Sequence, residues 1–318
     1  MSTNKTAVDT FAMDIEEGLR SSPKFLSSKY FYNAEGDRLF QEIMSMPEYY
    51  LTNAEAEILD KQSDAIRTSF GNQPVDIIEL GAGDGSKTKF LLKNMVDNKM
   101  DVRYIPSDIS PNILAELKSN FATEIPNLEV ITLAGDYFTS LVDLPDSTGR
   151  KRILLYLGAN IGNLEKSHAA EFIGQLKQFL NLGDSIMIGF DLKKDPQTIL
   201  DAYNDPAGIT AAFNINLLNR INIELDADFN VEQFSHWERY NPETGAARSY
   251  LVSRKKQKVN IGALEQSFEF EAWETIRMEL SQKYGMNDIA ELAKNSGYKF
   301  AERFVDSRGY FVDAVFEM

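Results

Sequence analysis

One stretch of the chain, residues 77–88, constrains the fold more than any other. It reads Ile-Ile-Glu-Leu-Gly-Ala-Gly-Asp-Gly-Ser-Lys-Thr, an apolar run followed by three alternate glycines and a polar helix start. Glycine lets a backbone turn sharply and approach a ligand where a Cβ would block it. The first N–H groups of a helix are unpaired and attract anionic groups. The stretch therefore predicts a strand, loop and helix that bind a nucleotide-like cofactor at the carboxyl end of the first strand of an open α/β sheet.

The spacing of these glycines indicates which cofactor binds. Gly81, Gly83 and Gly85 are followed by Ser86, where a dinucleotide-binding loop needs its third glycine. The acidic–x–G–x–G–x–G pattern resembles the first motif of the S-adenosylmethionine (SAM)-dependent methyltransferases. Glu79 at the end of the strand is then a candidate to meet the ammonium of the methionine moiety. An ordinary tight turn between strand and helix is the alternative, because a glycine-rich loop alone is a weak signal.

The composition of the chain excludes several classes of function. The 318 residues carry a net charge of −15, which opposes binding to nucleic acid or to an anionic membrane because both require a basic surface. With no cysteine and two histidines, disulfides and cysteine nucleophiles are excluded and no metal site is expected. No apolar run reaches the length of a membrane span, and the N-terminus lacks the apolar core of a signal peptide. We expect a cytoplasmic, monomeric enzyme with a small-molecule substrate and no nucleic-acid or membrane partner.

From Val75 the chain alternates between strands and helices, which predicts a parallel sheet with helices on both faces. After a helix at 286–296, strands at 298–305 and 310–316 form a closing hairpin that is typical of a methyltransferase sheet and not of a dinucleotide-binding one. The expected fold is α/β, a Rossmann-like class I methyltransferase with a seven-stranded sheet. The other strands are expected at 75–80, 103–107, 128–133, 152–157 and 184–190, and the helices between them at 86–97, 111–122 and 166–180.

The rest of the chain reads as a second, α+β domain. Residues 1–70 are mostly helical, and Thr52 with Glu55 three residues later has the pattern of a capping box for a helix through about Ser69. Residues 193–225 are helical, and strands follow up to residue 283. The expected domains are 71–192 plus 284–318 for SAM binding, and 1–70 plus 193–283 for substrate binding.

Polar residues follow three further strands of the predicted sheet. Asp108 is placed to accept from both ribose hydroxyls. Asp136 can accept from the adenine amine, and the ring of Tyr137 can stack on the base. Asn163 lies in the loop after the fourth strand. Asp108 or Asn163 could instead be a helix cap, but four polar features in order along one edge of the sheet favour a cofactor site.

One strand offers a pair of groups for a small polar substrate. In Ile276–Ser281 apolar and polar residues alternate, so Glu279 and Ser281 share a face of the strand and their backbones are roughly 6.5–7 Å apart. A carboxylate and a hydroxyl at that separation can hold the two nitrogens of one imidazole. The alternative is a solvent-facing polar strand on which Arg277 compensates the charge of Glu279. The pattern leaves both open.

Tyrosines gather in two loops ahead of the cofactor domain, at residues 30–32 and 49–50. Loop tyrosines at these positions are candidates for substrate contacts. Packing at an interface is the alternative, because tyrosine suits half-buried positions.

Taken together, these motifs resemble the histidine-specific methyltransferases that make hercynine for ergothioneine biosynthesis. They span nearly the whole chain in order. The stretches that carry the resemblance are Tyr30–Gly36, Leu39-Phe40, Pro47–Glu55, Glu79–Thr88, Leu157–Leu164, Ala202–Asn214 and Glu279–Lys283.

The resemblance implies an α-N-methyltransferase that acts three times on L-histidine with SAM as cofactor. It assigns Asn163 and Tyr203 to the carboxylate and α-amine side of the substrate, with Tyr49 close by, and Tyr32 to the methyl-transfer site. It assigns Glu279 and Ser281 to the imidazole, as the strand geometry suggests. The cofactor residues that it implies are Gly81, Lys87, Asp108, Asp136 and Tyr137, to which the loop adds Glu79 and Gly83. This chain departs from the family pattern at Leu251, where relatives usually carry Met beside the imidazole, and at Tyr137, where they often carry Phe.

Two other readings stay open. A different amino acid or small amine is the first alternative acceptor, and a cofactor-binding protein without catalysis is the second. Methyl transfer from a sulfonium is an in-line displacement by a neutral amine, and it needs neither a metal nor a covalent nucleophile. The tyrosines, Asn163 and Glu279, which the resemblance assigns to the substrate, are all present, and they favour an enzyme over a protein that only binds the cofactor.

Overall fold

A computed structural model describes residues 7–318, and the chain folds as two compact units. The N-terminal unit consists of the described residues up to Tyr50 together with Lys194–Ser281. The C-terminal unit consists of Leu51–Lys193 and Gln282–Met318. The first six residues of the polar N-terminus lie outside the described part.

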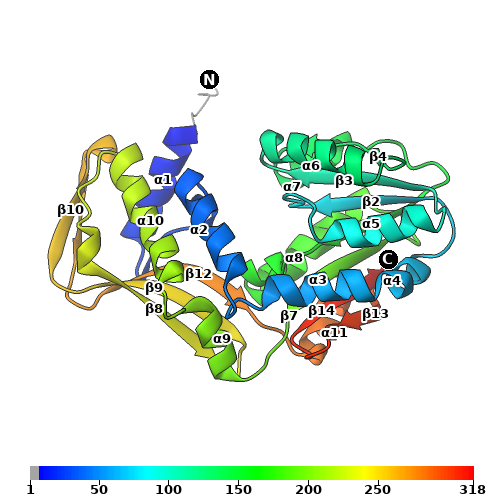
Figure 1. Cartoon of the computed structure of the whole chain (residues 1–318). Helices are drawn as coiled ribbons and strands as arrows, with labels where there is room; N and C mark the ends of the chain where they lie inside the picture. Colours follow the sequence, from blue (N-terminus) through cyan, green and yellow to red (C-terminus); the bar gives the residue numbers. More distant parts are fainter. Residues whose placement is uncertain (1–6) are drawn as a thin grey trace. The chain divides into compact units, whose positions relative to one another are not determined.

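The C-terminal unit is built on one twisted sheet (Figure 1). Its strands follow the order β13-β14-β7-β6-β2-β3-β4, and β5 also pairs with β3, so the eight described strands fill seven positions. All pairs among β2 to β7 are parallel, whereas β14 is antiparallel to β7 and to β13. The strand bounds are β2 Val75–Leu80, β3 Val102–Asp108, β4 Glu129–Val130, β5 Leu133–Ala134, β6 Lys151–Tyr156, β7 Ser185–Asp191, β13 Lys299–Val305 and β14 Phe311–Glu317.

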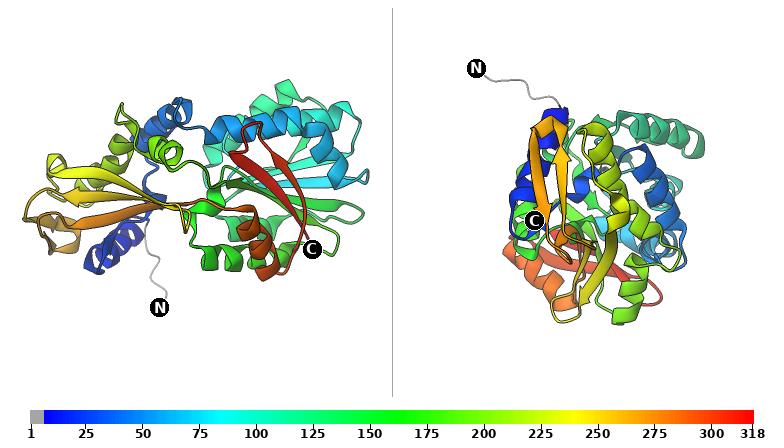
Figure 2. Two further views of the ribbon diagram at one scale, coloured as in Figure 1. Left: turned by 90° about the horizontal axis from the view of Figure 1, so that it is seen from below. Right: turned by 90° about the vertical axis from the view of Figure 1, so that its left-hand side faces the viewer.

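Helices cover both faces of this sheet (Figure 2). Every residue of β2 and β7 is buried, as expected for parallel strands with helices on both sides. On one face α3 packs against α5 and β14, and α4 packs against α5. On the other face Ile173 of α8 and Ile289 of α11 share a core with Ile78 of β2. The bounds are α3 Leu51–Lys61, α4 Ser63–Phe70, α5 Thr88–Asp97, α6 Pro111–Glu124, α7 Tyr137–Ser140, α8 Lys166–Gln175 and α11 Met286–Asn295, with 3-10 turns at Leu141–Asp143, Asn160–Asn163 and Leu176–Phe179.

The N-terminal unit pairs helices with a smaller sheet of order β1-β12-β9-β8 and a separate β10–β11 hairpin. Apolar side chains of α1, α2 and α10, among them Ile15, Ile43 and Leu217, pack against Ile276 and Met278 of β12. The bounds are α1 Ala7–Arg20, β1 Lys24–Phe25, α2 Ala34–Ser45, α9 Pro196–Tyr203, α10 Ile209–Glu224, β8 Phe234–Asn241, β9 Ala246–Ser253, β10 Gln257–Ile261, β11 Gln266–Phe270 and β12 Thr275–Gln282, with 3-10 turns at Ser28–Tyr30, Val231–Gln233 and Gly262–Leu264.

The class I methyltransferase fold is confirmed by this strand order, with the closing hairpin inserted antiparallel beside β7. Two local predictions were wrong. The helix expected from residue 52 to 69 is two helices, and α3 begins at Leu51, so the capping box of Thr52 and Glu55 does not form. In place of the strand expected at 128–133, the chain forms two short strands of two residues each, β4 and β5.

The division into units also differs from the expected one. Residues 51–70 were expected with the substrate domain, but α3 and α4 pack on α5 and fall in the C-terminal unit. The remaining boundaries move by one or two residues, to Lys193 and Ser281. None of the helices between residues 7 and 318 combines the length and the hydropathy that a membrane span requires.

Candidate active site

The glycine loop after β2 has the left-handed backbone that its sequence predicts, with φ of +67° at Gly81, +54° at Gly83 and +69° at Gly85. A Cβ at Gly85 would lie 2.7 Å from the ring of Phe121 on α6, so this glycine is required for packing. A Cβ at Gly83 would meet no protein atom within 4 Å, so this part of the loop faces space that a ligand can use.

Asp108, at the end of β3, holds the glycine loop in place. Its Oδ2 accepts from the Gly83 N–H at 3.1 Å, and its Oδ1 accepts from the Ser110 N–H at 3.0 Å. Each carboxylate oxygen has a further lone pair for another donor. Asp108 is therefore next to the loop, as predicted, and its predicted bonds to ribose hydroxyls are compatible with the contacts that it makes.

Asp136 and Tyr137 lie at the start of the short helix α7. The Asp136 carboxylate accepts from Phe138 N–H at 3.1 Å and Thr139 N–H at 3.2 Å, and hydrogen bonding by Thr139 lowers the pKa of this acid. It is thus a helix cap, a role that the sequence interpretation did not consider for it. The Tyr137 hydroxyl lies 3.1 Å from where a Cβ of Gly81 would stand, which brings this ring to the glycine loop.

Glu79 is buried beneath the loop. Its carboxylate accepts from Thr88 Oγ1 at 2.7 Å and from the hydroxyl of Tyr104, which tie β2 to α5 and β3. Burial raises the pKa of Glu79 to about 7, against the hydrogen bonds that lower it. The acid is therefore close to half ionised at neutral pH. Its predicted contact with a cofactor ammonium depends on that charge.

Lys87 forms a buried ion pair that local sequence patterns did not indicate. Its ammonium bonds Glu55 of α3, whose other oxygen accepts from the Gly158 N–H at 2.7 Å. The Glu55 side chain is 1% exposed and that of Lys87 is 25% exposed. Glu55 lies in a motif shared with the family, but its local pattern suggested a helix cap. Its role at the glycine loop follows only from its contacts with Lys87 and Gly158, which are far from it in the sequence.

Among the predicted substrate residues, the structure brings together Tyr49, Tyr203 and Ser281 of the N-terminal unit. The Tyr203 hydroxyl and Ser281 Oγ lie 2.8 Å apart, and the rings of Tyr49 and Tyr203 are 6.2 Å apart. His236, which was not predicted, fixes the backbone here, because its Nε2 lies 3.0 Å from the Tyr203 carbonyl oxygen. Burial lowers the pKa of His236, which favours the neutral ring.

Glu279 is partly exposed on β12, two residues before Ser281, and its N–H donates to Ser249 Oγ at 3.2 Å. The burial of the strand alternates as predicted up to Met278, whereas Leu280 is only half-buried. Leu251 is fully buried in the hydrophobic core of this unit, in register with His236. The departure from the family pattern at Leu251 thus lies in the core.

Tyr32 is 47% exposed and stands on an aromatic cluster. Its ring contacts Phe40 and Phe213 edge-on at centroid distances of 5.6 and 5.7 Å. Phe40 also contacts Tyr49 at 6.5 Å, so a continuous series of rings runs from Tyr32 to Tyr203. Phe40 and Phe213 lie in motifs of the resemblance, but no individual role had been predicted for them.

Asn163, the remaining predicted substrate residue, belongs to the C-terminal unit. It is exposed at the end of the 3-10 turn Asn160–Asn163. The preceding Gly162 packs closely on β12, since a Cβ there would lie 2.9 Å from the Gln282 carbonyl oxygen. Asn163 therefore follows a closely packed residue and is itself exposed.

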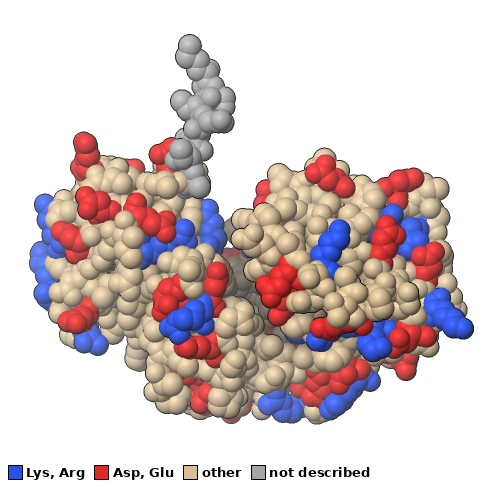
Figure 3. Space-filling view, turned by 45° about the horizontal axis from the view of Figure 1, so that its top comes forward, with Lys and Arg blue, Asp and Glu red and all other residues tan. Residues whose placement is uncertain are grey.

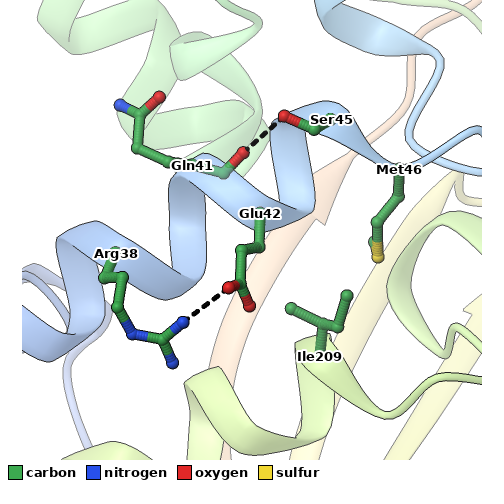
Figure 4. Close-up of a pocket in the computed structure, with 6 residues that line it drawn as sticks. All are labelled: Arg38, Gln41, Glu42, Ser45, Met46 and Ile209. Carbon is green, nitrogen blue, oxygen red and sulfur yellow. Dashed lines mark hydrogen bonds and ion pairs between the residues drawn. The ribbon is translucent and has the colours of Figure 1, made fainter.

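A surface hollow on the N-terminal unit lies elsewhere (Figure 4). Arg38 and Glu42 form an ion pair along its α2 side, and Met46 and Ile209 give it an apolar end. None of the predicted site residues lines it. Its lining residues are Arg38, Gln41, Glu42, Ser45, Met46 and Ile209.

Comparison with known proteins decides the family. A family model described as histidine-specific, SAM-dependent methyltransferase matches residues 11–318. The chain belongs to this family. It is 37% identical over 307 residues to the histidine N-alpha-methyltransferase of Mycolicibacterium smegmatis, covering 96% of this chain and 94% of that protein. It is 36% identical over 281 residues to the enzyme of the same name from Mycobacterium tuberculosis, covering 88% of this chain and 86% of that one.

A larger protein is also similar to this chain. Ergothioneine biosynthesis protein 1 of Schizosaccharomyces pombe is 30% identical over 301 residues, which cover 91% of this chain and 38% of that protein.

As a member of the matched family, the chain is a SAM-dependent methyltransferase. When bound, the cofactor supplies an electrophilic methyl group on a sulfonium. The open side of the loop at Gly83 and the adjacent Asp108 and Tyr137 fit a nucleoside ligand.

Proposed function

We propose that this methyltransferase transfers three methyl groups from SAM to the α-amine of L-histidine and so makes hercynine. The observation that carries the proposal is the contact of Tyr203 with Ser281 at 2.8 Å, with Glu279 two residues away on the same strand. Two relatives, which are 37% and 36% identical to this chain over the aligned residues, are named histidine N-alpha-methyltransferases.

The two polar groups on β12 match the chemistry of an imidazole. The Glu279 carboxylate accepts from a ring N–H, and the Ser281 hydroxyl donates to or accepts from the other nitrogen. Tyr203 bonds Ser281 and so limits the rotation of its hydroxyl. A substrate that lacks a second ring nitrogen would form one hydrogen bond fewer with this pair of groups, which costs affinity.

The reaction is a displacement at the methyl carbon. The lone pair of the neutral amine forms the new C–N bond while the C–S bond of the sulfonium breaks. Each of the three transfers uses an amine that has lost a proton, so the whole sequence releases three protons. A nearby sulfonium charge lowers the pKa of the amine and makes this loss easier. Tyr32 and Tyr49 are proposed to line the path of the amine, and a tyrosine hydroxyl or a water carries the proton away.

The aromatic cluster suits the product of this reaction. A trimethylated amine is a permanent cation without a donor, and aromatic faces attract such cations. Tyr32, Phe40 and Phe213 present rings within 6 Å of one another. We infer that Tyr32 contacts the growing methylammonium group. Asn163 is proposed to bind the substrate carboxylate.

For the C-terminal unit, we propose the cofactor roles that the resemblance implies. Gly81 and Gly83 admit the ligand, Asp108 accepts from ribose hydroxyls, and the loop of Asp136 and Tyr137 meets the base. Lys87 and Glu79 are proposed to balance the charges of the methionine moiety. We also propose that the protein acts as a monomer.

A small-molecule acceptor is also supported by charge. The chain carries a net charge of −15, and on the face shown in Figure 3 Lys and Arg residues are interspersed with Asp and Glu. We infer that nucleic acids and membrane surfaces are not partners, because both would require a basic patch.

Another amine is the second candidate acceptor. One matching protein acts on a different amine by name, the 4-dimethylallyltryptophan N-methyltransferase easF of Claviceps fusiformis at 26% identity. Turnover of SAM with each of the twenty amino acids distinguishes the two candidates. The proposal expects a trimethylated product from L-histidine alone, detected by mass spectrometry, and preference for any other amino acid contradicts it.

A further inference from the structure

Glu55 of α3 makes polar contacts with two loops of the C-terminal unit. It is fully buried, and its two carboxylate oxygens point to two different loops. One oxygen pairs with the ammonium of Lys87, which opens α5 after the glycine loop. The other accepts from the N–H of Gly158, two residues beyond the end of β6. The side chain thus links the cofactor loop to the loop that carries Asn163.

The strand beneath Glu55 leaves room for it. A Cβ on Gly189 of β7 would lie 2.3 Å from Glu55 Oε1, a distance that no real contact of a Cβ shows. Glycine at this place in a buried strand weakens the strand and needs a reason, such as the close approach of another group. The approaching group here is the Glu55 carboxylate.

Two buried carboxyl groups, those of Glu55 and Asp313, lie near Lys87, and Glu55 is the one that pairs with its ammonium. Asp313 of β14 faces the same region, in register with Gly189, and is fully buried. Burial, and then the negative charge of Glu55, raise the pKa of Asp313 well above its usual range, which favours its neutral form. Burial lowers the pKa of Lys87, but the charge and hydrogen bond of Glu55 outweigh it and the net shift is upward. Glu55, which contacts the Lys87 ammonium directly, therefore favours the charged form of Lys87.

We propose that Glu55 is a positioning residue of the methyltransferase, which holds the Lys87 ammonium at the cofactor loop and anchors the Asn163 loop through Gly158. The inference rests on the proposed function, which assigns Lys87 to the cofactor and Asn163 to the substrate. Glu55 itself acts through these groups and contacts neither ligand.

Two substitutions separate the two contacts. Glu55→Gln keeps an oxygen that accepts from Gly158 but removes the charge that pairs with Lys87. Glu55→Ala removes both contacts. We expect Glu55→Gln to weaken SAM binding about tenfold, with the KM for L-histidine within about twofold of the wild type. We expect Glu55→Ala to weaken SAM binding as much and to raise the KM for L-histidine as well. A Glu55→Gln protein with unchanged SAM affinity overturns the proposal.

A double-mutant cycle with Lys87→Met shows whether Glu55 acts through the lysine. SAM binding is measured by calorimetry without histidine, on Glu55→Gln, Lys87→Met and the double variant. If Glu55 acts through Lys87, the double variant binds SAM as weakly as Lys87→Met alone. A further loss of affinity in the double variant contradicts the proposal. The double variant removes both charges of the buried pair, and comparing its SAM affinity with that of Lys87→Met alone tests the proposal even where the unpaired lysine of Glu55→Gln prevents folding.

Glu57→Gln is the matched control. Glu57 lies on the same helix, but its carboxylate accepts from Ser307 and pairs with Lys61 at the surface. Its SAM affinity is expected to equal that of the wild type, and a tenfold loss there would assign the effect to α3 as a whole and overturn the role of Glu55. Binding of SAM is read without the acceptor. Failure of the wild type to methylate histidine therefore rejects the proposed function and leaves the cycle readable.

Discussion

The hydroxyl of Tyr203 lies 2.8 Å from Oγ of Ser281, although 78 residues separate the two in the chain. Tyr203 ends α9 and Ser281 lies near the end of β12. This contact joins the helix that follows the methyltransferase strands to the strand that carries Glu279. It places the proposed imidazole site on two elements of the N-terminal unit, β12, whose Ile276 and Met278 lie in the core, and α9, which packs against β8.

Removal of either hydroxyl is expected to reduce recognition of histidine. Tyr203→Phe and Ser281→Ala each remove one hydrogen bond, worth about 0.5–1.5 kcal/mol, so kcat/KM for histidine should fall about threefold to tenfold. Because the two groups share one bond, the double variant should lose less than the product of the single losses. Steady-state kinetics with saturating SAM measure this. Full additivity would mean that the two hydroxyls act independently.

Glu279 is expected to set specificity. Glu279→Ala removes a charge-assisted hydrogen bond to the imidazole, worth about 1.5–3 kcal/mol, so kcat/KM for histidine should fall about 10- to 100-fold, mostly through KM. The control is Arg277→Ala, two residues earlier on the same strand, where the side chain is exposed. Its kinetics should stay close to the wild type. If Glu279→Ala keeps its kcat/KM for histidine, the strand is an ordinary solvent-facing one and the assignment is wrong.

Alanine substitutions at Gly83 and Gly149 separate the effect of backbone strain on stability from the effect of an added Cβ on SAM binding. Gly83 and Gly149 both have left-handed backbones, with φ of +54° and +78°, and a Cβ at either meets no protein atom within 4 Å. Gly83→Ala and Gly149→Ala should therefore lose a similar stability of about 1–2 kcal/mol from backbone strain. Only Gly83→Ala should weaken SAM binding, because only its Cβ would point into the ligand space. Equal SAM affinity for the two variants would place the cofactor elsewhere.

Gly85→Ala should differ from both. Its Cβ would lie 2.7 Å from the Phe121 ring, so the substitution adds a steric clash to the backbone strain. Overpacking costs about 1–3 kcal/mol beyond the strain, and the melting temperature should fall further than for Gly83→Ala. Thermal unfolding of the variants without cofactor measures this, and equal melting temperatures would show that Phe121 moves aside without cost.

The raised pKa of Glu79 predicts a pH-dependent stability. The folded protein holds a proton on Glu79 up to a pKa of about 7, whereas the usual value is 4.5. Between pH 4.5 and about 7 the folded state therefore binds more protons than the unfolded state. The free energy of unfolding falls as the pH rises through this range. Glu79→Gln mimics the protonated acid and lacks this dependence. Relative to wild type, its free energy of unfolding should improve by about 2–3 kcal/mol between pH 5 and pH 8.

Denaturant unfolding at several pH values measures the effect. Asp136→Asn is the control, because Asp136 is exposed and hydrogen bonding from Thr139 lowers its pKa, so its difference from wild type should be constant over that range. A constant difference for Glu79→Gln as well would mean that Glu79 is ionised throughout the range.

The sheet could be predicted from sequence because its signals are local. Buried parallel strands such as β2 and β7 are rich in apolar residues, although β2 also carries Asp76 and Glu79. The roles of side chains were harder to predict. Thr52 and Glu55 have the spacing of a capping box, but α3 begins one residue earlier and Glu55 bonds Gly158, 103 residues away. A spacing of three residues cannot distinguish a local cap from a distant partner.

The domain boundary was misplaced for a similar reason. Helices α3 and α4 are amphipathic, and a sequence shows that a helix has an apolar face without showing which core that face joins. Ile58 of α3 and Ile66 of α4 are fully buried in the C-terminal unit. The exposed Tyr32 and Asn163 remain predictions, because their roles depend on a ligand.

The most direct test of the account is mass spectrometry of L-histidine incubated with the wild-type protein and SAM. The account predicts that histidine is converted to a trimethylated species with the methyl groups on the α-nitrogen, and that Glu279→Ala forms it much more slowly at low histidine concentration. Unmodified histidine after full exposure to active, SAM-binding protein, or methylation on the imidazole ring, would contradict it.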